Sequence, residues 1–580
     1  MMDSDYSDKK GVSVLMDLFA MKGIRKLVMS PGSRNAPLLF SFSRNPAFEK
    51  YVIADERSAG FFALGLALAS GEAVGLVCTS GTAMLNYAPA VAEAFYRGIP
   101  LVAVTADRPA EWIDQDEGQT IRQEGAMAGF VKSYCSLRAE FDTSASAWYA
   151  NRRLNEVLNH ALMPRRGPVH INMSFCEPLY GTSSGYSGKE RAITFVRERQ
   201  ELPEEVWDML VRRFLEAPRV MIVAGFYPPD EDVSAALRDI CKFPHTVLFA
   251  ESLSNIRTDT GICTVDRVLA VAGEDESLYP ELLISFGGSL VSRMLKTFLR
   301  RAKPAEHWGI DERFPAPDTF CALTHHICTG ASGFWKEFAG RLKDKAPESL
   351  SPEGVSYAGS WQKIKRKAYL LHRTFMADAG WSDLKAFEVI LRHIPHDAAL
   401  HVANSTPVRY LQLFEHAHYA GGEWSNRGTN GIEGATSTAM GFSEVYSGTT
   451  LLITGDLSFM YDSNALWMPY VNGRIRVIVM RNGGGGIFRF IPGPDSLKEL
   501  ETCFETPLEV PVREMAGAYG WRYMKAASAE ELETVLPSFF ASGDRAVLLE
   551  VETPRFENAP VLKSYFTYTY ISGESYPVNR

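Results

Sequence analysis

Short apolar runs alternate with longer amphipathic or small-residue segments along most of the chain. Most of the apolar runs stop at or close to a glycine, serine, aspartate or asparagine, as buried strands do at a turn. The longer segments have the length and period of helices. Parallel strands need a crossover of this kind. The pattern therefore predicts an α/β fold with mainly parallel sheets flanked by helices. In the first third of the chain, strands are predicted at residues 26–29, 51–54, 75–78, 101–105 and 169–172.

The same alternation occurs in two further regions, which polar stretches separate. Residues 181–200 and 343–355 have the composition of linkers. At 580 residues the chain is also too long for one ordinary hydrophobic core. We therefore expect three domains, at residues 1–185, 200–345 and 356–580. The later strands are predicted at residues 219–224, 246–249 and 282–286 in the second region, and at 398–402, 451–454, 475–480 and 546–550 in the third.

Composition narrows the class of protein. Hydrophobic residues make up 46% and charged residues 22%, as in globular proteins, and the net charge of −9 argues against a nucleic-acid partner. The polar start does not resemble a signal peptide, and no run of about 18 apolar residues could span a membrane. Eight scattered cysteines fit reduced thiols in the cytoplasm, where we expect the protein to be. Residues 321–328 carry two cysteines and two histidines, but no second ligand pair follows at zinc-like spacing, so no metal is expected there.

Two strand ends in the third region carry oxygen ligands. Gly455-Asp456 ends one apolar run, and Asn482 with four glycines ends another, with 25 residues between Asp456 and Asn482. Neighbouring parallel strands bring such ends side by side, so that a carboxylate and an amide oxygen converge. Hard oxygen donors suit Mg²⁺, and the glycines allow a backbone carbonyl to approach as a further ligand. The alternative is two ordinary strand-end turns, since Gly-Asp and Asn-Gly are common turn dipeptides.

The first region also has polar residues at predicted strand ends. Ser33 and Arg34 lie in a Pro-Gly loop, where Arg34 could hold a carboxylate through paired hydrogen bonds. A Ser-Gly-Thr turn at residues 79–82 feeds a helix, as ligand-binding turns of α/β sheets do. Glu56 lies just before a predicted helix and, on its own, could be an exposed carboxylate stabilised by the helix dipole. Arg108 and Gln119 follow the next strand end.

Seven segments together match one enzyme family in order and spacing. They are SPGSRNAPL (30–38), DERSAGFFALGLA (55–67), TSGTAMLNYAPAVAEA (79–94), TADRPAEW (105–112), GQTIRQ (118–123), SNRGTNGIEG (425–434) and TGDLSFMYDSNAL (454–466). By these segments the chain resembles the 2-succinyl-5-enolpyruvyl-6-hydroxy-3-cyclohexene-1-carboxylate synthases, thiamine-diphosphate-dependent enzymes of menaquinone biosynthesis. The likeness covers the first and third regions well and the middle one weakly. Leu457 departs from the small residue of many thiamine enzymes, and Glu433 stands where this family more often has aspartate.

The resemblance implies thiamine diphosphate held with Mg²⁺ or Mn²⁺. It implies a pyrimidine-binding, a middle and a diphosphate-binding domain in that order, and a homodimer or homotetramer with the active site between subunits. By this resemblance the metal ligands are Asp456, Asn482 and the carbonyl of Gly484, while Glu56 activates the cofactor pyrimidine and Ile432 is an apolar wedge beneath it. The implied cofactor-binding residues are Glu56, Thr79, Ser80, Gly81, Ile432, Gly455, Asp456, Leu457, Ser458, Asn482, Gly484, Ile487 and Phe488.

The implied reaction is the decarboxylation of 2-oxoglutarate and the addition of the resulting succinyl carbanion to isochorismate. Both small-molecule substrates are dicarboxylates, so several arginines must meet in the site. Arg293 and Lys296 are weaker candidates, because the alignment of their loop is uncertain. The candidate catalytic residues are Glu56, Ser33, Arg34, Arg108, Gln119, Asn404, Arg409 and Arg427.

Three other readings remain open from the residues. A related thiamine enzyme of acetolactate-synthase or decarboxylase type would act on a small monocarboxylate and would not need these arginines. A cofactor-binding protein without catalysis would not need Glu56 together with Asp456 and Asn482. A flavin or nicotinamide oxidoreductase would need a G-x-G-x-x-G fingerprint, which follows none of the middle strands and is not matched by the glycine run 483–486.

Overall fold

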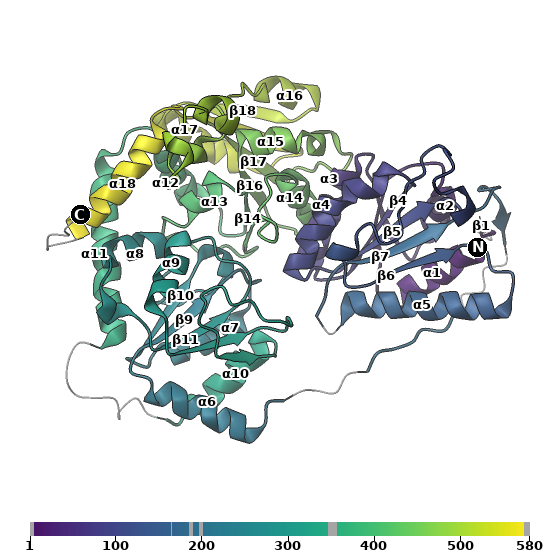
Figure 1. Ribbon diagram of the computed structural model, residues 1–580. Coiled ribbons are helices and arrows are strands. Elements are labelled where there is room, and N and C mark those ends of the chain that lie inside the picture. The colour runs from purple at the N-terminus through teal and green to yellow at the C-terminus, as the bar shows by residue number, and fades with distance from the viewer. Residues whose placement is uncertain (1–4, 164, 185–189, 197–200, 346–355, 574–580) are drawn as a thin grey trace.

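A computed structural model describes residues 5–163, 165–184, 190–196, 201–345 and 356–573 (Figure 1). Three large sheets follow one another along the chain, and we call the parts built on them the N-terminal, middle and C-terminal units. The two outer sheets have six strands and the middle sheet has five, and all neighbouring strands in the three sheets run parallel. Helices flank each sheet. The predicted α/β class is confirmed.

The N-terminal sheet has the strand order β3-β2-β4-β5-β7-β6. The strand predicted at residues 51–54 lies slightly earlier, as β3. The edge strand β6 was missed because its exposed positions interrupt the apolar pattern. The strands are β2 (Lys26–Met29), β3 (Glu49–Val52), β4 (Val74–Cys78), β5 (Leu101–Asp107), β6 (Tyr134–Arg138) and β7 (Val169–Ser174). The helices are α1 (Lys10–Met21), α2 (Ala36–Arg44), α3 (Glu56–Ser70), α4 (Thr82–Arg97) and α5 (Ser144–Leu162).

Only parts of the two predicted linkers can be compared with the structure. Within the first, β8 (Thr182–Ser183) pairs antiparallel with β1 (Tyr6–Ser7), so these residues are not a free linker. Residues 185–189 and 197–200 of the first linker, and 346–355 of the second, lie outside the described residues.

The middle sheet has the order β10-β9-β11-β12-β13. The predicted cysteine and histidine segment contains the short edge strand β13, and Cys321 and Cys328 beside it are exposed. Across the described residues, no group of three or more His, Cys, Asp or Glu side chains could hold a metal ion. The strands are β9 (Val220–Ala224), β10 (Thr246–Ala250), β11 (Leu282–Phe286), β12 (Glu306–Ile310) and β13 (His325–Ile327), and the helices are α6 (Glu204–Glu216), α7 (Glu231–Ile240), α8 (Val265–Ala272), α9 (Arg293–Ala302) and α10 (Ala331–Leu342).

The C-terminal sheet has the order β15-β14-β16-β17-β19-β18. The strands are β14 (Ala399–Val402), β15 (Glu423–Trp424), β16 (Thr450–Gly455), β17 (Ile475–Arg481), β18 (Arg522–Ala526) and β19 (Val547–Glu552). The helices are α11 (Tyr357–Asp378), α12 (Asp383–His393), α13 (Thr406–Leu411), α14 (Ala435–Val445), α15 (Asp456–Tyr461), α16 (Val512–Ala518), α17 (Ala529–Phe540) and α18 (Asn558–Gly573).

The crossover between β16 and β17 is not one continuous helix. Helix α15 ends at Tyr461, and a separate 3₁₀ turn covers Ser463–Trp467. The break occurs at Asp462, whose buried carboxylate accepts hydrogen bonds from the backbone N–H and the hydroxyl of Ser437, both at 2.7 Å. This tertiary contact with α14 takes the place of a continued helix.

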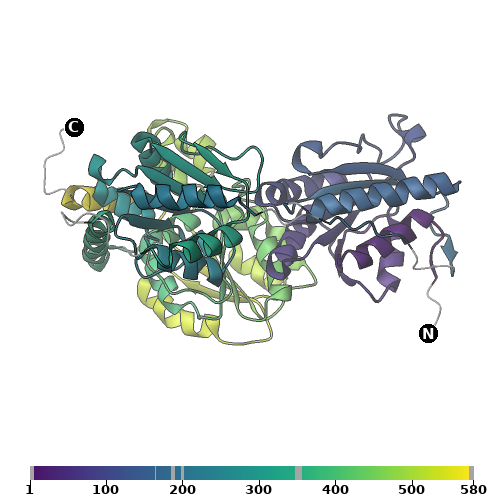
Figure 2. The same ribbon diagram turned by 90° about the horizontal axis from the view of Figure 1, so that it is seen from below.

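Helices α3 and α14 join the N-terminal unit to the C-terminal unit (Figure 1). A Cβ atom on Gly65 would lie 2.0 Å from the carbonyl oxygen of Thr438, and one on Gly441 would lie 2.0 Å from that of Phe62. Only glycine permits this approach of two helix backbones. Seen from below, the N-terminal unit occupies one side of the molecule, and the middle and C-terminal units lie together on the other (Figure 2).

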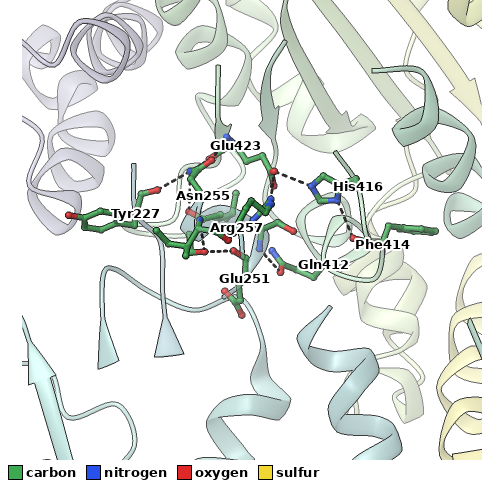
Figure 3. A network of polar contacts seen from close by, with 12 residues as sticks. Tyr227, Glu251, Asn255, Arg257, Gln412, Phe414, His416 and Glu423 are labelled. Carbon is green, nitrogen blue, oxygen red and sulfur yellow. Dashed lines mark hydrogen bonds and ion pairs between the residues drawn. The ribbon is translucent and has the colours of Figure 1, made fainter. Parts of the chain in front are cut away.

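A buried polar network ties the middle unit to the C-terminal unit (Figure 3). The Asn255 amide donates to the carbonyl of Tyr227 at 2.8 Å and accepts the N–H of Glu423 at 2.8 Å. The fully buried Glu423 carboxylate pairs with Arg257 and, at 3.0 Å, with His416. Burial alone would raise the pKa of Glu423, but Arg257 and then His416 lower it. The carboxylate is thus kept charged at the seam between the two units.

Among the helices of the described residues, none is long and apolar enough to cross a membrane.

Candidate active site

The ends of β16 and β17 lie side by side, as the sequence predicts. These strands are parallel neighbours, with Gly455 opposite Met480. Asp456 follows β16 directly and begins α15, and Asn482 follows β17. The two candidate ligands therefore occupy one edge of the C-terminal sheet, at the carboxyl ends of the strands, where α/β sheets bind their ligands.

The Asp456 carboxylate is held by backbone N–H groups. One oxygen accepts from Gly483 at 2.8 Å and from Gly484 at 3.0 Å, and the other accepts from Leu457 at 2.7 Å. Burial raises the pKa of Asp456 to about 6, although these N–H groups oppose the change. The hydrogen bonds fix the carboxylate and leave lone pairs for a cation.

The Asn482 amide is oriented and has an unused acceptor. Its Nδ2 donates to the Asp383 carboxylate at 2.8 Å. Its Oδ1 is buried and has no hydrogen-bond partner among the described residues. A buried acceptor without a partner is costly, and such an atom beside a carboxylate at a strand end fits a missing ligand. Gly483 and Gly484 have φ angles of +83° and +127°, a backbone conformation that residues with a Cβ atom rarely adopt. The oxygen donors here suit a divalent cation.

The loop before α14 carries Ile432 and is pinned from several sides. The Ile432 carbonyl accepts the Ser458 hydroxyl at 2.6 Å. The Asn404 amide donates to the carbonyls of Asn426 and Gly431, both at 2.6 Å. Ile432 itself is half-buried, as are Ile487 and Phe488 after the glycine run. The loop is therefore a fixed support on the C-terminal unit.

Glu56 lies inside the first turn of α3 rather than just before the helix. Asp55 is the N-cap, accepting the N–H of Ser58 at 2.8 Å, and its carboxylate also accepts from Asn464. Arg57 donates to the carbonyl of Tyr461 at 2.7 Å. The Glu56 position is thus held against the segment that follows Asp456. Burial raises the pKa of Glu56, its own N–H opposes this, and the neighbouring Asp55 adds to the increase.

Two arginines gather at the carboxyl edge of the N-terminal sheet. Arg34 is buried, donates to the carbonyl of Phe175 at 3.1 Å and pairs with Glu177 at 3.1 Å. Arg108 donates to the Gly118 carbonyl at 2.8 Å. Burial, and then the charge of Arg108, lower the pKa of Arg34. The two guanidinium groups therefore share one neighbourhood, as a site for an anion requires.

The Ser-Gly-Thr turn of the N-terminal unit also contains buried hydroxyls without partners. Among the described residues, nothing hydrogen-bonds Thr79 Oγ1 or Ser80 Oγ. The Gly81 N–H donates to Gln123 at 2.8 Å, and Gln119, at φ +54°, lies against Gly81. Gln123 was not a candidate from the sequence, although it ends the matching segment GQTIRQ. Ser33 is exposed in the loop after β2.

Four cations form a basic cluster between the middle and C-terminal units. Burial, then Arg427, then Arg293 lower the pKa of Arg409 to about 10. Burial lowers the pKa of Lys296, with Arg427 and Arg293 among the contributing charges. Arg427 is buried and donates to Asn404 Oδ1 at 2.9 Å. The structure therefore brings Arg293 and Lys296 to Arg409 and Arg427. It also shows Asn404 occupied in holding Arg427 and its loop.

Two buried glutamates that the sequence did not single out support this cluster. Glu93 of α4 accepts the N–H groups of Gly428 and Thr429 at 2.8 and 2.7 Å, next to Arg427. Glu251 accepts those of Val291 and Ser292 at 2.7 and 2.6 Å, at the start of α9. Burial raises the pKa of Glu251 to about 7. The sequence signal that could have identified Glu93 and Glu251 is a single acidic residue in an otherwise apolar stretch.

Sequence comparisons match the chain to thiamine-dependent enzymes. The family described as "Thiamine pyrophosphate enzyme, N-terminal TPP binding domain" matches residues 9–126. A 2-succinyl-5-enolpyruvyl-6-hydroxy-3-cyclohexene-1-carboxylate synthase of Porphyromonas gingivalis is 98% identical over 579 residues and covers 100% of both chains. The synthase of Flavobacterium psychrophilum is 39% identical and covers 95% of this chain and 97% of its own.

A solved structure shares the fold. The thiamine diphosphate-dependent 4-hydroxybenzoylformate decarboxylase of Rhodococcus jostii has a TM-score of 0.68 at 19% identity and covers 95% of this chain and 100% of its own. The synthase relatives match over nearly their whole length, which confirms the resemblance drawn from the motifs. The chain therefore belongs to the 2-succinyl-5-enolpyruvyl-6-hydroxy-3-cyclohexene-1-carboxylate synthase family of thiamine-diphosphate-dependent enzymes.

Proposed function

We propose that the site decarboxylates 2-oxoglutarate and adds the remaining succinyl unit to isochorismate. The products are CO₂ and 2-succinyl-5-enolpyruvyl-6-hydroxy-3-cyclohexene-1-carboxylate, an intermediate of menaquinone biosynthesis. The chain is a transferase that depends on thiamine diphosphate and a divalent cation. The observation that carries the substrate assignment is the gathering of Arg293, Arg409 and Arg427, since two dicarboxylates need several cations.

When bound, the cofactor supplies an electron sink. This allows the bond between the carbonyl carbon and the carboxylate of 2-oxoglutarate to break and a new carbon–carbon bond to form. Asp456, Asn482 and the carbonyl of Gly484 hold the metal, for which Mg²⁺ and Mn²⁺ both suit the oxygen donors. Glu56 would donate a hydrogen bond to the pyrimidine, and burial, which raises its pKa, favours the protonated carboxyl that this needs. Ile432 would be the apolar wedge beneath the cofactor. The other cofactor-binding residues are Thr79, Ser80, Gly81, Gly455, Leu457, Ser458, Ile487 and Phe488.

The arginines orient the two substrates. Arg34 and Arg108, with Ser33 and Gln119, bind carboxylates at the edge of the N-terminal sheet. Arg34 can do so because its charged partner, Glu177, has a side chain that is 67% exposed and easily displaced, while the Phe175 carbonyl holds the guanidinium in place. On the other side, Arg409 and Arg427 bind carboxylates, and Asn404 acts through Arg427. Arg293 and Lys296 complete that second group.

The chain has a pyrimidine-binding domain at residues 1–185, a middle domain at 200–345 and a diphosphate-binding domain at 356–580. We infer a homodimer or homotetramer in which the pyrimidine domain of one subunit completes the site of another. This inference comes from the family to which the chain belongs. Within the single chain described, Asp55 and Arg57 contact the segment after Asp456, and the next experiment distinguishes a site made in one chain from one made between two. The eight unpaired cysteines support a cytoplasmic location.

Co-expression of two inactive chains tests the shared site. One chain carries Glu56→Gln and the other Asp456→Ala, so each spoils a different half of the site. If the halves come from two subunits, random pairing leaves about a quarter of the sites intact, and about a quarter of the activity returns. A site made within one chain would give no activity in the mixture. Light scattering during size-exclusion chromatography gives the subunit number.

The reaction is tested by ultraviolet detection of isochorismate consumption with 2-oxoglutarate, thiamine diphosphate and Mg²⁺, leaving out each component in turn. We expect consumption only in the complete mixture. Arg409→Ala should reduce isochorismate-dependent turnover by about tenfold or more, whereas Arg522→Ala, on the exposed strand β18, should not. Release of CO₂ from a 2-oxo acid without loss of isochorismate would instead indicate an enzyme of acetolactate-synthase type.

A further inference from the structure

Asp383 is a buried carboxylate that none of the roles above uses. It is the first residue of α12 and is 2% exposed. Its two oxygens have different partners: one accepts Asn482 Nδ2 at 2.8 Å, and the other accepts the Thr553 hydroxyl at 2.6 Å. Asn558 accepts the Asp383 N–H at 2.7 Å. Asp383 therefore connects the start of α12 with the chain after β17, the chain after β19 and the start of α18.

The contact with Asn482 spans 99 residues and determines which way its amide faces. An amide has a donating and an accepting end, whereas an ionised carboxylate only accepts. An ionised Asp383 can therefore bond Asn482 only through Nδ2, which is the contact that the structure shows. The opposite orientation would place the Asn482 oxygen against the carboxylate oxygen, which is repulsive. With Nδ2 occupied, Oδ1 is left as the buried atom without a partner among the described residues.

Asp383 also adds charge to this end of the sheet. Its field is among the influences on Asp456, the other side-chain ligand of the proposed metal site. Two buried carboxylates near one another attract a divalent cation more strongly than one does, because the low dielectric screens little. A carboxylate behind a metal ligand commonly fixes the orientation of that ligand and is costly to replace.

We propose that Asp383 is a positioning residue for the divalent cation: it fixes the Asn482 amide so that Oδ1 faces the metal, while Asp383 itself does not bind it. The inference rests on the proposed metal site of Asp456, Asn482 and Gly484. A purely structural alternative is that Asp383 only ties α12 to the chain after β19, through Thr553 and Asn558. The two roles predict different effects on metal affinity.

The test replaces Asp383 by asparagine, which has nearly the same shape. An asparagine can accept from Asn482 Nδ2 or donate to its Oδ1, so both amide orientations become possible, and the negative charge is lost. With thiamine diphosphate in excess, we expect the Kd of Mn²⁺, measured from the free-ion signal in electron paramagnetic resonance, to rise about 10- to 100-fold. Excess Mg²⁺ should restore most of kcat, because the ligand itself remains.

Thr553→Val is the matched control. It removes the other side-chain hydrogen bond to the same carboxylate and leaves Asn482 untouched. We expect a lower melting temperature but a Mn²⁺ Kd within about twofold of the wild-type value, since the metal ligand keeps its partner. An Asp383→Asn protein that folds and binds Mn²⁺ as the wild type does would overturn the proposal. An equal loss of affinity in both variants would also overturn it, because the effect would then be structural.

A double variant, Asp383→Asn with Asn482→Asp, carries the test if the single variant does not fold. The new asparagine donates to one oxygen of the new aspartate, which leaves the other oxygen for the cation. We expect this protein to bind Mn²⁺ within about tenfold of the wild-type Kd. A folded double variant without Mn²⁺ binding contradicts the proposal. Wild-type protein that binds Mn²⁺ and cofactor but does not consume isochorismate refutes only the proposed reaction, whereas wild-type protein that binds no Mn²⁺ refutes both.

Discussion

Backbone N–H groups hold several of the buried carboxylates around the site. Asp456 accepts three of them, and Glu93 and Glu251 accept two each. Such groups stabilise a negative charge without neutralising it. The carboxylate of Asp456 therefore stays available for a cation, and the two glutamates fix the loops that carry Arg427 and Arg293. At the scale of single residues, the site is organised by hydrogen bonds to the main chain.

The first prediction concerns Glu56. Replacing it by glutamine keeps the shape and the position at the start of α3 but removes the carboxyl group, whose pKa burial raises. We expect kcat to fall about 10²- to 10⁴-fold, the usual contribution of a general acid, with the melting temperature nearly unchanged. Steady-state isochorismate consumption measures this. The control is Glu72→Gln, an exposed partner of Lys26, which should keep full activity. Retained activity in Glu56→Gln would remove Glu56 from the mechanism.

At the scale of elements, the packing of α3 against α14 aligns the N-terminal and C-terminal parts of the site. Phe61 on α3 lies against Gly434, just before α14, where a Cβ atom would meet its ring at 2.1 Å. Gly434 also has a φ of +75°, which favours glycine. The two glycines inside the helices bring the backbones of α3 and α14 together, and Gly434 lets the Phe61 ring lie against the loop that carries Ile432. Small residues here therefore serve the site as well as stability.

The second prediction tests this packing. In Gly65→Ala the added methyl group would lie 2.0 Å from the Thr438 carbonyl, so the helices must move apart. We expect the free energy of unfolding to fall by about 1–3 kcal/mol, with weaker cofactor binding, because the two sides of the site separate. Urea unfolding and cofactor titration measure the two effects.

Gly340→Ala is the control for that prediction. Gly340 is an exposed position of α10, and nothing lies within 4 Å of where its Cβ would be. Alanine should stabilise this helix by about 0.5–1 kcal/mol, because it has less backbone freedom to lose on folding. If Gly65→Ala were as stable as the wild type, the close approach of α3 and α14 would not matter to the fold.

At the scale of the whole molecule, buried polar groups link units that are far apart in sequence. Arg267 of α8, 1% exposed, pairs with Glu415 at 3.0 Å, and Arg257 and His416 share Glu423. Replacing one member of such an ion pair by a neutral residue leaves the other as an uncompensated buried charge. The middle unit is thereby held in one position against the sheet that carries Asp456 and Asn482. Its contribution is to present α9 and its cations to the site.

The third prediction concerns histidines that burial keeps neutral. Burial lowers the pKa of His401 to about 3 and that of His170 to about 4. Below about pH 6.5 the unfolded chain binds a proton at each of these residues while the folded chain does not, so stability is lost as the pH falls. For each of these histidines, the free energy of unfolding should fall by about 1.4 kcal/mol per pH unit between roughly pH 6.5 and the folded-state pKa.

The measurement is the melting temperature between pH 7.5 and 5.0. His401→Phe keeps a ring against Phe442 and should flatten the fall in melting temperature relative to the wild type. The exposed His160→Gln should leave the pH dependence as it is. An unchanged profile in His401→Phe would show that this residue does not titrate on unfolding.

Much of the architecture and of the metal-binding edge could be predicted from local pattern. Buried strands such as β9, β11 and β17 have continuous apolar runs, because both faces of a parallel sheet are covered. Asp456 and Asn482 were identifiable because the end of such a run also locates the edge of the sheet. The edge strands β6, β13 and β18 were not predicted, since partial exposure removes the apolar pattern. Glu56 was predicted to lie before its helix, whereas α3 begins at this residue, because helix ends are predicted less reliably than helix interiors.

The sequence by itself determined the α/β class, the places of most strand ends and the family to which the chain belongs, because these depend on periodicity and on motifs of neighbouring residues. The tertiary structure decided which distant groups meet. Asn482 is oriented by a carboxylate 99 residues away, and Glu93 holds a loop 335 residues away. Such contacts leave no signal in the neighbouring sequence, because the two polar groups meet only after the chain has folded. Once buried, each group needs its hydrogen-bond partner.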